Sequence, residues 1–344
     1  MPFCPRCGTP VLSTGDECAR CAAAPTSAPA AEHRFRFHGA GGTLLKIYLV
    51  TFLLTLATLG LYYFWGKTRI RKYLAGSIEF AGDRLAYHGT GGELLRGFAV
   101  AVAVFGALLG QMLLWPVLFP DEPKAAGAGV AVFYIALMLL IPASIVGAWR
   151  YRLSRTSWRE IRFGFDGGRL EFLKIYFGGL ALTVLTLSLY APFWAVRMHR
   201  FLVANARLGS APFGFDGNGR DLFKTWVVAL LLALPTFTLS LYWYQVRQAN
   251  YFFNRTTIGN ARFALDLRAS EFFGVFLGSY VLTVFTLGIG FPWAQCMLLR
   301  FFTDRLTLCG ELPAAGQRLS GASATGEELS DVVDAGGVDL SLGL

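Results

Sequence analysis

Four cysteines near the start of the chain are the residues whose type and spacing most clearly support chemistry. Cys4 and Cys7 form one CxxC pair, and Cys18 and Cys21 form a second pair ten residues later. Each pair can hold a metal ion between two thiolates, and a short hairpin between the pairs would complete a tetrahedral site. Because thiolates would fill all four positions, we predict a structural Zn²⁺ ion that drives the folding of a small zinc ribbon. A disulfide-linked hairpin is the alternative, which a reducing cytoplasm disfavours.

Three arginines at recurring positions are the second candidates for chemistry. Arg69, Arg197 and Arg247 each follow a tryptophan by three or four residues. Guanidinium groups beside aromatic residues at a membrane surface can bind lipid phosphates or other anions. We therefore take these three arginines as candidate anion- or lipid-binding residues.

The sequence carries no recognisable set of catalytic residues. It lacks a Ser-His-Asp arrangement and a Walker loop, and the glycine-rich run at residues 89–92 is not followed by Gly-Lys-Ser/Thr. We therefore expect a protein that is not an enzyme.

The composition points to a membrane protein. Hydrophobic residues make up 54% of the 344 residues and charged residues only 15%, and the mean hydropathy is +0.48. Apolar stretches near the ~20 residues that cross a bilayer lie at about 44–65, 94–119, 130–149, 172–194, 222–243 and 272–294. The net charge of +9 could attract nucleic acid. Since the bases flank apolar segments beside Trp and Tyr, we expect membrane lipids as partners instead.

The elements that position these residues belong to an internal repeat. Five copies of an aromatic-x-Gly motif precede the helices that we expect, with a polar residue six positions later and, in four copies, a base three positions further on. The copies begin at Phe37, Tyr87, Phe165, Phe215 and, degraded, Leu265. The residues before the glycines, His38, His88, Asp166 and Asp216, fit turn chemistry better than a ring of titratable sites.

A second signature ends the apolar stretch of four copies. It reads Thr-Leu-Gly/Ser-Leu-Tyr at Thr58, Thr186 and Thr238, with a variant at Thr286. A basic helix and a short strand-like segment follow, for example at residues 77–80, 160–163 and 260–263. The predicted fold class is therefore an all-α polytopic membrane protein built from internal repeats, with short strand-like connecting segments and a small N-terminal zinc ribbon.

These motifs resemble the YjgN-like family of bacterial inner-membrane proteins. The run Thr-Leu-Gly-Leu-Tyr-x-Phe-Trp-Gly-Lys-Thr-Arg at 58–69 and Tyr-His-Gly-Thr-Gly-Gly-Glu-Leu at 87–94 carry the resemblance, which extends over residues 34–310. It implies a multi-pass helical protein of the inner membrane, to which the ribbon is an addition. It implies no biochemical activity and no functional residue.

Two membrane topologies are compatible with the sequence. Bases follow five of the six apolar stretches, so alternating loops cannot all be cytoplasmic. Each unit could be a helical hairpin with the threonine signature at its tip and the second unit expanded, which would bring the arginines to membrane depth. Alternatively the basic segments lie along the interface as amphipathic helices, which we favour. Both solutions keep the ribbon in the cytoplasm.

The predicted domain organisation has four parts. The zinc ribbon occupies residues 1–21, a flexible linker 22–33, the repeat-built multi-pass transmembrane domain 34–310 and a disordered tail 311–344. The leading hypothesis for function is a transporter or channel for a small solute. The alternative is a non-transporting membrane adaptor that recruits a protein partner through its cytoplasmic ribbon.

Overall fold

The fold repeats one strand–helix–helix–strand unit five times along the chain. A computed structural model describes residues 32–120 and 124–312. Unit 1 contains β1 (Glu32–Phe37), α2 (Gly41–Ala57), α3 (Tyr63–Gly76) and β2 (Ile78–Phe80), and unit 2 contains β3 (Asp83–Tyr87), α4 (Gly91–Leu118), α5 (Ala125–Arg155) and β4 (Thr156–Trp158). Unit 3 contains β5 (Ile161–Phe165), α6 (Arg169–Leu185), α7 (Ala191–Ala204) and β6 (Ala206–Leu208). Unit 4 contains β7 (Ala211–Phe215), α8 (Gly219–Leu231), α9 (Leu239–Asn254) and β8 (Thr256–Ile258), and unit 5 contains β9 (Ala261–Leu265), α10 (Ala269–Phe285), α11 (Phe291–Thr303) and β10 (Leu306–Cys309).

The strands form one closed antiparallel barrel. The two strands of each unit pair with each other, two-residue turns join β2 to β3 and each later unit to the next, and β10 pairs with β1 to close the ring. Closure satisfies the backbone groups that an open sheet would leave at its edges. A strand of three residues is stable here because both of its neighbours bond to it.

Apolar side chains from all ten described strands fill the barrel. In unit 1 Phe35 lies opposite Phe80, and their rings stack with centroids 4.3 Å apart. The equivalent opposed pairs are Leu85 with Trp158, Phe163 with Leu208, Phe213 with Ile258, and Phe263 with Leu308. These residues pack in one cluster. The barrel axis is thus a packed core rather than a channel.

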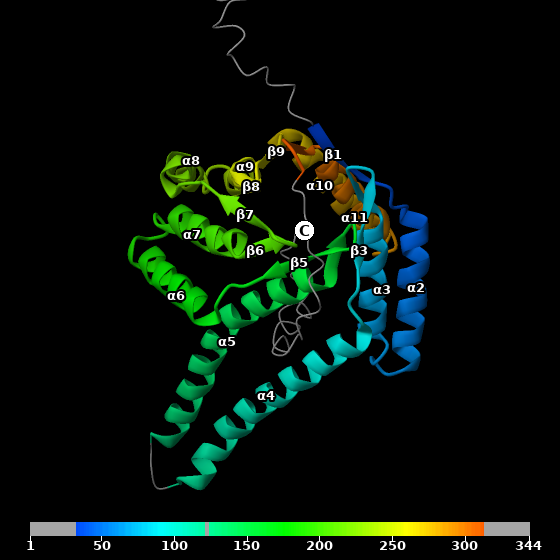
Figure 1. The fold of residues 1–344 in the computed structure, drawn as a ribbon. Helices are drawn as coiled ribbons and strands as arrows, with labels where there is room; N and C mark the ends of the chain where they lie inside the picture. Colours follow the sequence, from blue (N-terminus) through cyan, green and yellow to red (C-terminus); the bar gives the residue numbers. More distant parts are fainter. Residues whose placement is uncertain (1–31, 121–123, 313–344) are drawn as a thin grey trace, which may run out of the picture.

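The helices form five hairpins that surround the barrel in chain order, from α2–α3 to α10–α11 (Figure 1). Aromatic residues of one hairpin pack on the first turn of the next. A Cβ atom at Gly91 would lie 2.6 Å from the ring of Trp65, and one at Gly41 would lie 2.4 Å from the ring of Trp293. The contact at Gly41 joins unit 5 to unit 1, so the hairpins form a closed ring like the strands.

The predicted fold class, an all-α polytopic membrane protein, is wrong. The short strand-like segments pair with one another in a closed barrel instead of serving as isolated connections. Their partners lie up to 277 positions away, as Glu32 pairs with Cys309, and no local pattern reveals such pairing. Glu32 and His33, which the sequence assigned to the linker, lie in β1.

Four of the six predicted spans are also wrong. The stretches at 44–65, 172–194, 222–243 and 272–294 each contain a turn and divide between two antiparallel helices. Within the described residues, two helices are long and apolar enough to cross a membrane, Gly91–Leu118 and Gly127–Arg155. Hydropathy missed the four turns because their residues are as apolar as the helices that they join.

The turn at each hairpin tip has one geometry in units 1, 3, 4 and 5. Two successive residues adopt positive φ, as in Leu59 (52°) and Gly60 (97°), and a threonine hydroxyl donates to the carbonyl four residues earlier, as Thr58 does to Leu54. In unit 4 the threonine is Thr236, whose hydroxyl donates to Leu232. The sequence analysis placed this signature at Thr238, two residues too late.

We expect Thr238→Gly to raise the free energy of unfolding by about 0.5 to 1 kcal/mol, because a β-branched residue in the left-handed region costs more than the added flexibility of glycine in the unfolded chain. Thr238 has φ 69°, and the equivalent residues of units 1 and 5 are Gly60 and Gly288. Thermal unfolding in detergent measures the effect. Thr236→Gly is the contrasting variant, since it removes the hydroxyl bonds of the turn and should lower stability. A lower midpoint for Thr238→Gly would refute the assignment.

Candidate membrane and lipid-headgroup interface

Exposed bases occupy one position on the first helix of four units. Lys46, Arg96, Lys174 and Lys224 are each the sixth residue of their helix and are exposed. In unit 5 this position is Gly274. The repeat thus places four positive charges at the same position along the first helices of four units.

The three candidate arginines form a matching row on the second helices. Arg69, Arg197 and Arg247 each lie nine residues before the strand that closes their unit, and all three are exposed. Arg69 donates to the hydroxyl of Tyr62 at 3.1 Å. Arg197 lies 5.5 Å from the ring centre of Tyr190, and Arg247 lies 4.8 Å from that of Trp243. Each arginine thus contacts an aromatic residue at or near the start of its helix, and its charge stays in reach of an external anion.

The two rows lie at nearly the same distance from the barrel end of the helices. A first-helix base is five residue rises from the start of its helix, about 7.5 Å, and an arginine such as Arg69 is seven rises from the end of its helix, about 10.5 Å. The structure therefore places the three predicted site residues at equivalent positions on three separate hairpins. They form a belt and not a single pocket. We call these seven residues, Lys46, Arg69, Arg96, Lys174, Arg197, Lys224 and Arg247, the basic belt.

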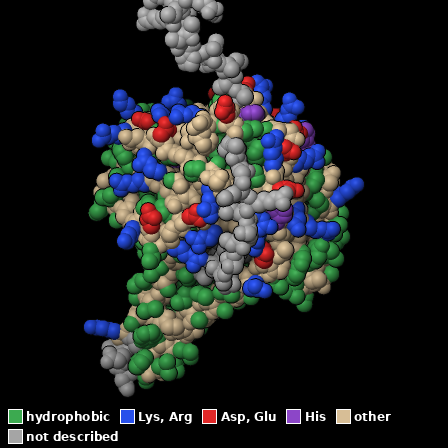
Figure 2. Space-filling view, in the orientation of Figure 1, with side chains coloured by type: hydrophobic (Ala, Val, Ile, Leu, Met, Phe, Trp, Pro, Cys, Tyr) green, Lys and Arg blue, Asp and Glu red, His purple; other side chains and the backbone are tan. Residues whose placement is uncertain are grey.

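Beyond the basic belt and Lys67, the hairpins of units 1, 3 and 4 carry no charged residue up to their tips. Residues 47–66, 175–196 and 225–246 contain no Asp, Glu, Lys or Arg. The tip residues Leu59, Leu187, Phe237 and Leu287 expose 85% to 97% of their surface. Figure 2 shows apolar side chains along the α4–α5 hairpin and charged side chains gathered over the rest of that face. Apolar surface of this extent marks an interaction site.

A second series of polar side chains stabilises the ring and is not available for ligands. Arg150, Arg200 and Arg300 each donate to the backbone carbonyl of a turn glycine in the following unit, at 2.8, 2.6 and 3.4 Å respectively. Asn250 replaces the base in unit 4 and bonds both backbone groups of Leu267. This role was not predicted from the sequence. The spacing of 17 residues from Arg150 to Gly167 and from Arg200 to Gly217 was the available signal.

The titratable residues before the turn glycines have structural partners on the barrel. His38 bonds Glu79 at 2.6 Å, and Asp166 pairs with Arg207 at 2.9 Å. Burial lowers the pKa of His88, and the positive charges of Arg162, Lys72 and Arg155 lower it further. His88 is therefore neutral near pH 7, where its ring bonds the Ser157 hydroxyl at 2.8 Å.

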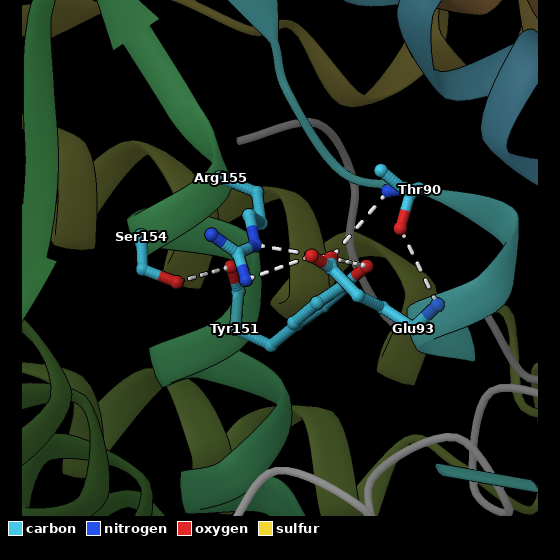
Figure 3. Close-up of polar contacts among 5 residues, drawn as sticks. All are labelled: Thr90, Glu93, Tyr151, Ser154 and Arg155. Carbon is cyan, nitrogen blue, oxygen red and sulfur yellow. Dashed lines mark hydrogen bonds and ion pairs between the residues drawn. The ribbon is translucent and has the colours of Figure 1, made fainter. Parts of the chain in front are cut away.

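Glu93 joins the two ends of the longest hairpin. It is the third residue of α4 and completes a capping box with Thr90, while Arg155 at the end of α5 donates to both of its carboxylate oxygens, at 3.1 and 3.0 Å. The Tyr151 hydroxyl also donates to Glu93, at 3.2 Å. Figure 3 shows the carboxylate between Thr90 and Arg155. Acidic residues also occupy the third helical position in units 3, 4 and 5, as the sequence predicts.

We expect Glu93→Ala to lower the free energy of unfolding by about 2 to 3 kcal/mol, since it removes the capping box and leaves Arg155 and Tyr151 without their shared acceptor. Glu171→Ala is the matched control, because Glu171 holds the same helical position in unit 3 without an ion pair to the described residues. Its expected cost is below about 0.5 kcal/mol. Thermal unfolding of both variants in one detergent checks this, and equal losses would contradict it.

The predicted zinc ligands Cys4, Cys7, Cys18 and Cys21 lie outside the described residues, so the zinc site stays a prediction. Within residues 32–120 and 124–312 the cysteines are Cys296 and Cys309, both free, and this part of the chain contains no cluster of metal-ligating side chains.

One comparison with known proteins gives a match. A family model described as a bacterial protein of unknown function (DUF898) matches residues 32–241 and 227–332. Together these matches include every strand and helix described above. They agree with the resemblance to the YjgN-like family, which is the same family. No curated protein and no solved structure matches the chain.

Proposed function

The chain belongs to the DUF898 family of bacterial proteins of unknown function, and from this premise we propose that it is a membrane-embedded module that binds lipid phosphates. The barrel lies in the aqueous phase, the four short hairpins enter one leaflet, and the α4–α5 hairpin crosses the bilayer. The observation that carries the proposal is the basic belt, a set of exposed bases at equivalent positions on the hairpins of four units, together with the exposed apolar tips of the short hairpins.

The length of the short hairpins supports insertion to half depth. From Lys46 to the end of α2 at Ala57 the helix advances about 16 Å. Half of the hydrocarbon core of a bilayer is about 15 Å. With the basic belt among the phosphates of one leaflet, the tips Leu59, Leu187, Phe237 and Leu287 therefore come to rest near the bilayer centre.

The long hairpin has the dimensions of a full crossing. From Arg96 to the end of α4 at Leu118 the helix advances about 33 Å, which exceeds the ~30 Å core. The loop between α4 and α5 would then emerge on the far side. Since bases prefer the cytoplasmic side, the barrel faces the cytoplasm and the membrane is the inner membrane of a bacterium.

This arrangement favours the non-transporting hypothesis over solute transport. A path along the barrel axis would have to pass the packed rings of Phe35, Phe80 and their equivalents. A module that holds lipid phosphates while presenting a barrel to the cytoplasm suits an adaptor. The zinc ribbon predicted at residues 1–21 would recruit the protein partner, and it would lie on the barrel side because Glu32 begins β1.

Depth-dependent fluorescence quenching tests the proposal. A fluorophore attached to a single cysteine at Leu187 or Leu287 should be quenched most by lipids that carry a quencher at the end of the acyl chain. A fluorophore at Ser210, in an exposed barrel turn, should be quenched only by a water-soluble quencher. Tip fluorophores that respond to the water-soluble quencher and not to the lipid quenchers would refute half-depth insertion.

A further inference from the structure

We infer that the protein acts as a wedge in the membrane and prefers, or imposes, curvature with the barrel on the convex side. The inference rests on the proposed function, because it takes the depth of the hairpins as given. It goes further by assigning a mechanical activity to the inserted part.

The helices occupy very different areas in the two leaflets. In the proposed arrangement all ten helices of the described chain enter the leaflet on the barrel side. Of these, α4 and α5 are long and apolar enough to continue into the other leaflet. A helix with its side chains is about 10 to 12 Å wide, so each displaces roughly 80 to 110 Å² of leaflet area. The barrel-side leaflet therefore accommodates roughly 600 to 900 Å² more protein than the opposite leaflet. Extra area in one leaflet is relieved when that leaflet becomes the convex one.

The apolar tips hold the short hairpins at a fixed depth, so the difference in area between the leaflets persists. The protein itself leaves at least 85% of the surface of Leu187 and of Leu287 uncovered. Withdrawing a hairpin from the leaflet would therefore transfer this apolar surface, and the apolar flanks of both helices, from lipid to water. Crossing to the far side would carry the bases of that hairpin into hydrocarbon, which costs about 2.5 to 3.5 kcal/mol for each base at the centre of the bilayer. Half depth is therefore the favoured position of each short hairpin.

The units of the ring are joined tightly, so the difference in area between the leaflets must be accommodated by the lipids and not by the protein. The closed barrel fixes where each hairpin begins. The bonds from Arg150, Arg200 and Arg300 to the next unit, and the packing of Trp293 on Gly41, fix each hairpin to its neighbour. A loose set of hairpins could close together to reduce the area, whereas a ring with a packed barrel core resists that change.

Membrane tubes drawn from giant vesicles provide the test. The full chain, with Ser210→Cys labelled from outside by an impermeant dye, reports only molecules whose barrels face outward. In this variant the chain's other cysteines are replaced by serine. We expect the protein density on the tube to exceed that on the flat membrane by about ten-fold, the ratio produced by a preference of about 1.4 kcal/mol. The enrichment should grow as the tube narrows. A ratio of one or below at every tube radius would overturn the inference.

A variant and a depth measurement separate this failure from that of the proposed function. Aspartate at the four tips, Leu59, Leu187, Phe237 and Leu287, should reduce the enrichment to about one while the α4–α5 hairpin keeps the protein in the membrane. Fluorophores at the tips of the same reconstituted protein report depth. Tips at half depth without enrichment would overturn the wedge alone. Tips outside the hydrocarbon would overturn both, since the difference in area would then be absent.

Discussion

Aspartate at the four hairpin tips should remove the short hairpins from the bilayer while the barrel stays folded. The variant combines Leu59→Asp, Leu187→Asp, Phe237→Asp and Leu287→Asp. Burying Asp in place of Leu or Phe in hydrocarbon costs about 3 to 4 kcal/mol per site. The native side chains expose 85% to 97% of their surface, so the fold loses few contacts. A cysteine at Ile289, which is also exposed beside a tip, should become reactive to an impermeant thiol reagent from the barrel side.

The control for this variant is Ser210→Asp, which adds the same charge in an exposed barrel turn and should leave the cysteine at Ile289 protected. Retained cooperative unfolding in detergent would show that the tip variant is folded. If the cysteine at Ile289 stays protected in the folded tip variant, the tips do not lie in hydrocarbon and half-depth insertion is wrong.

Removing the three arginines of the basic belt should weaken the selection of anionic lipid. In the variant, Arg69, Arg197 and Arg247 become Gln. Each base near a membrane surface contributes about 1 kcal/mol of attraction to anionic lipid, so we expect about five-fold weaker binding at each site and about 3 kcal/mol in total. The ratio of anionic to neutral lipid that remains bound after gentle detergent extraction measures the effect.

A matched variant separates position from net charge. Arg34, Arg36 and Arg84 are exposed on the barrel, away from the basic belt, and their replacement by Gln removes the same charge. We expect the lipid ratio of this variant to equal that of the native protein. Equal losses in both variants would mean that overall charge, and not the belt, attracts the lipid.

The sequence predicted the repeat and some of the local elements, because these follow from short-range patterns, although the division of four apolar stretches into two helices each was missed. The turns before Gly39 and Gly167 and the acidic residues such as Glu93 in the first helical turn stand where the motifs placed them. Short strand-like segments were also recognised, for example at 77–80. Their closure into a barrel was missed because three-residue strands carry almost no alternation and their partners are distant in the chain.

The sequence predicted only part of the candidate site, because the role of each base depends on neighbouring units that are distant in the chain. Spacing identified Arg69, Arg197 and Arg247, and the structure places them at equivalent exposed positions on three hairpins. The same basic helices also carry Arg200 and Arg300, whose side chains bond turn carbonyls of the next unit. Sequence shows that bases recur, but only the arrangement of neighbouring units separates those that face outward from those that join the ring.

The most direct test of the central claim is two-sided thiol labelling of single cysteines, on a background in which the chain's own cysteines are replaced by serine. Half-depth insertion predicts that Lys124→Cys, in the α4–α5 loop, reacts only from the far side, and that Ser210→Cys, on the barrel, reacts only from the cytoplasmic side. Cysteines at Leu187 and Leu287 should react from neither side. Tip cysteines that react from the same side as Lys124→Cys would show that the short hairpins cross the membrane, and the account would be wrong.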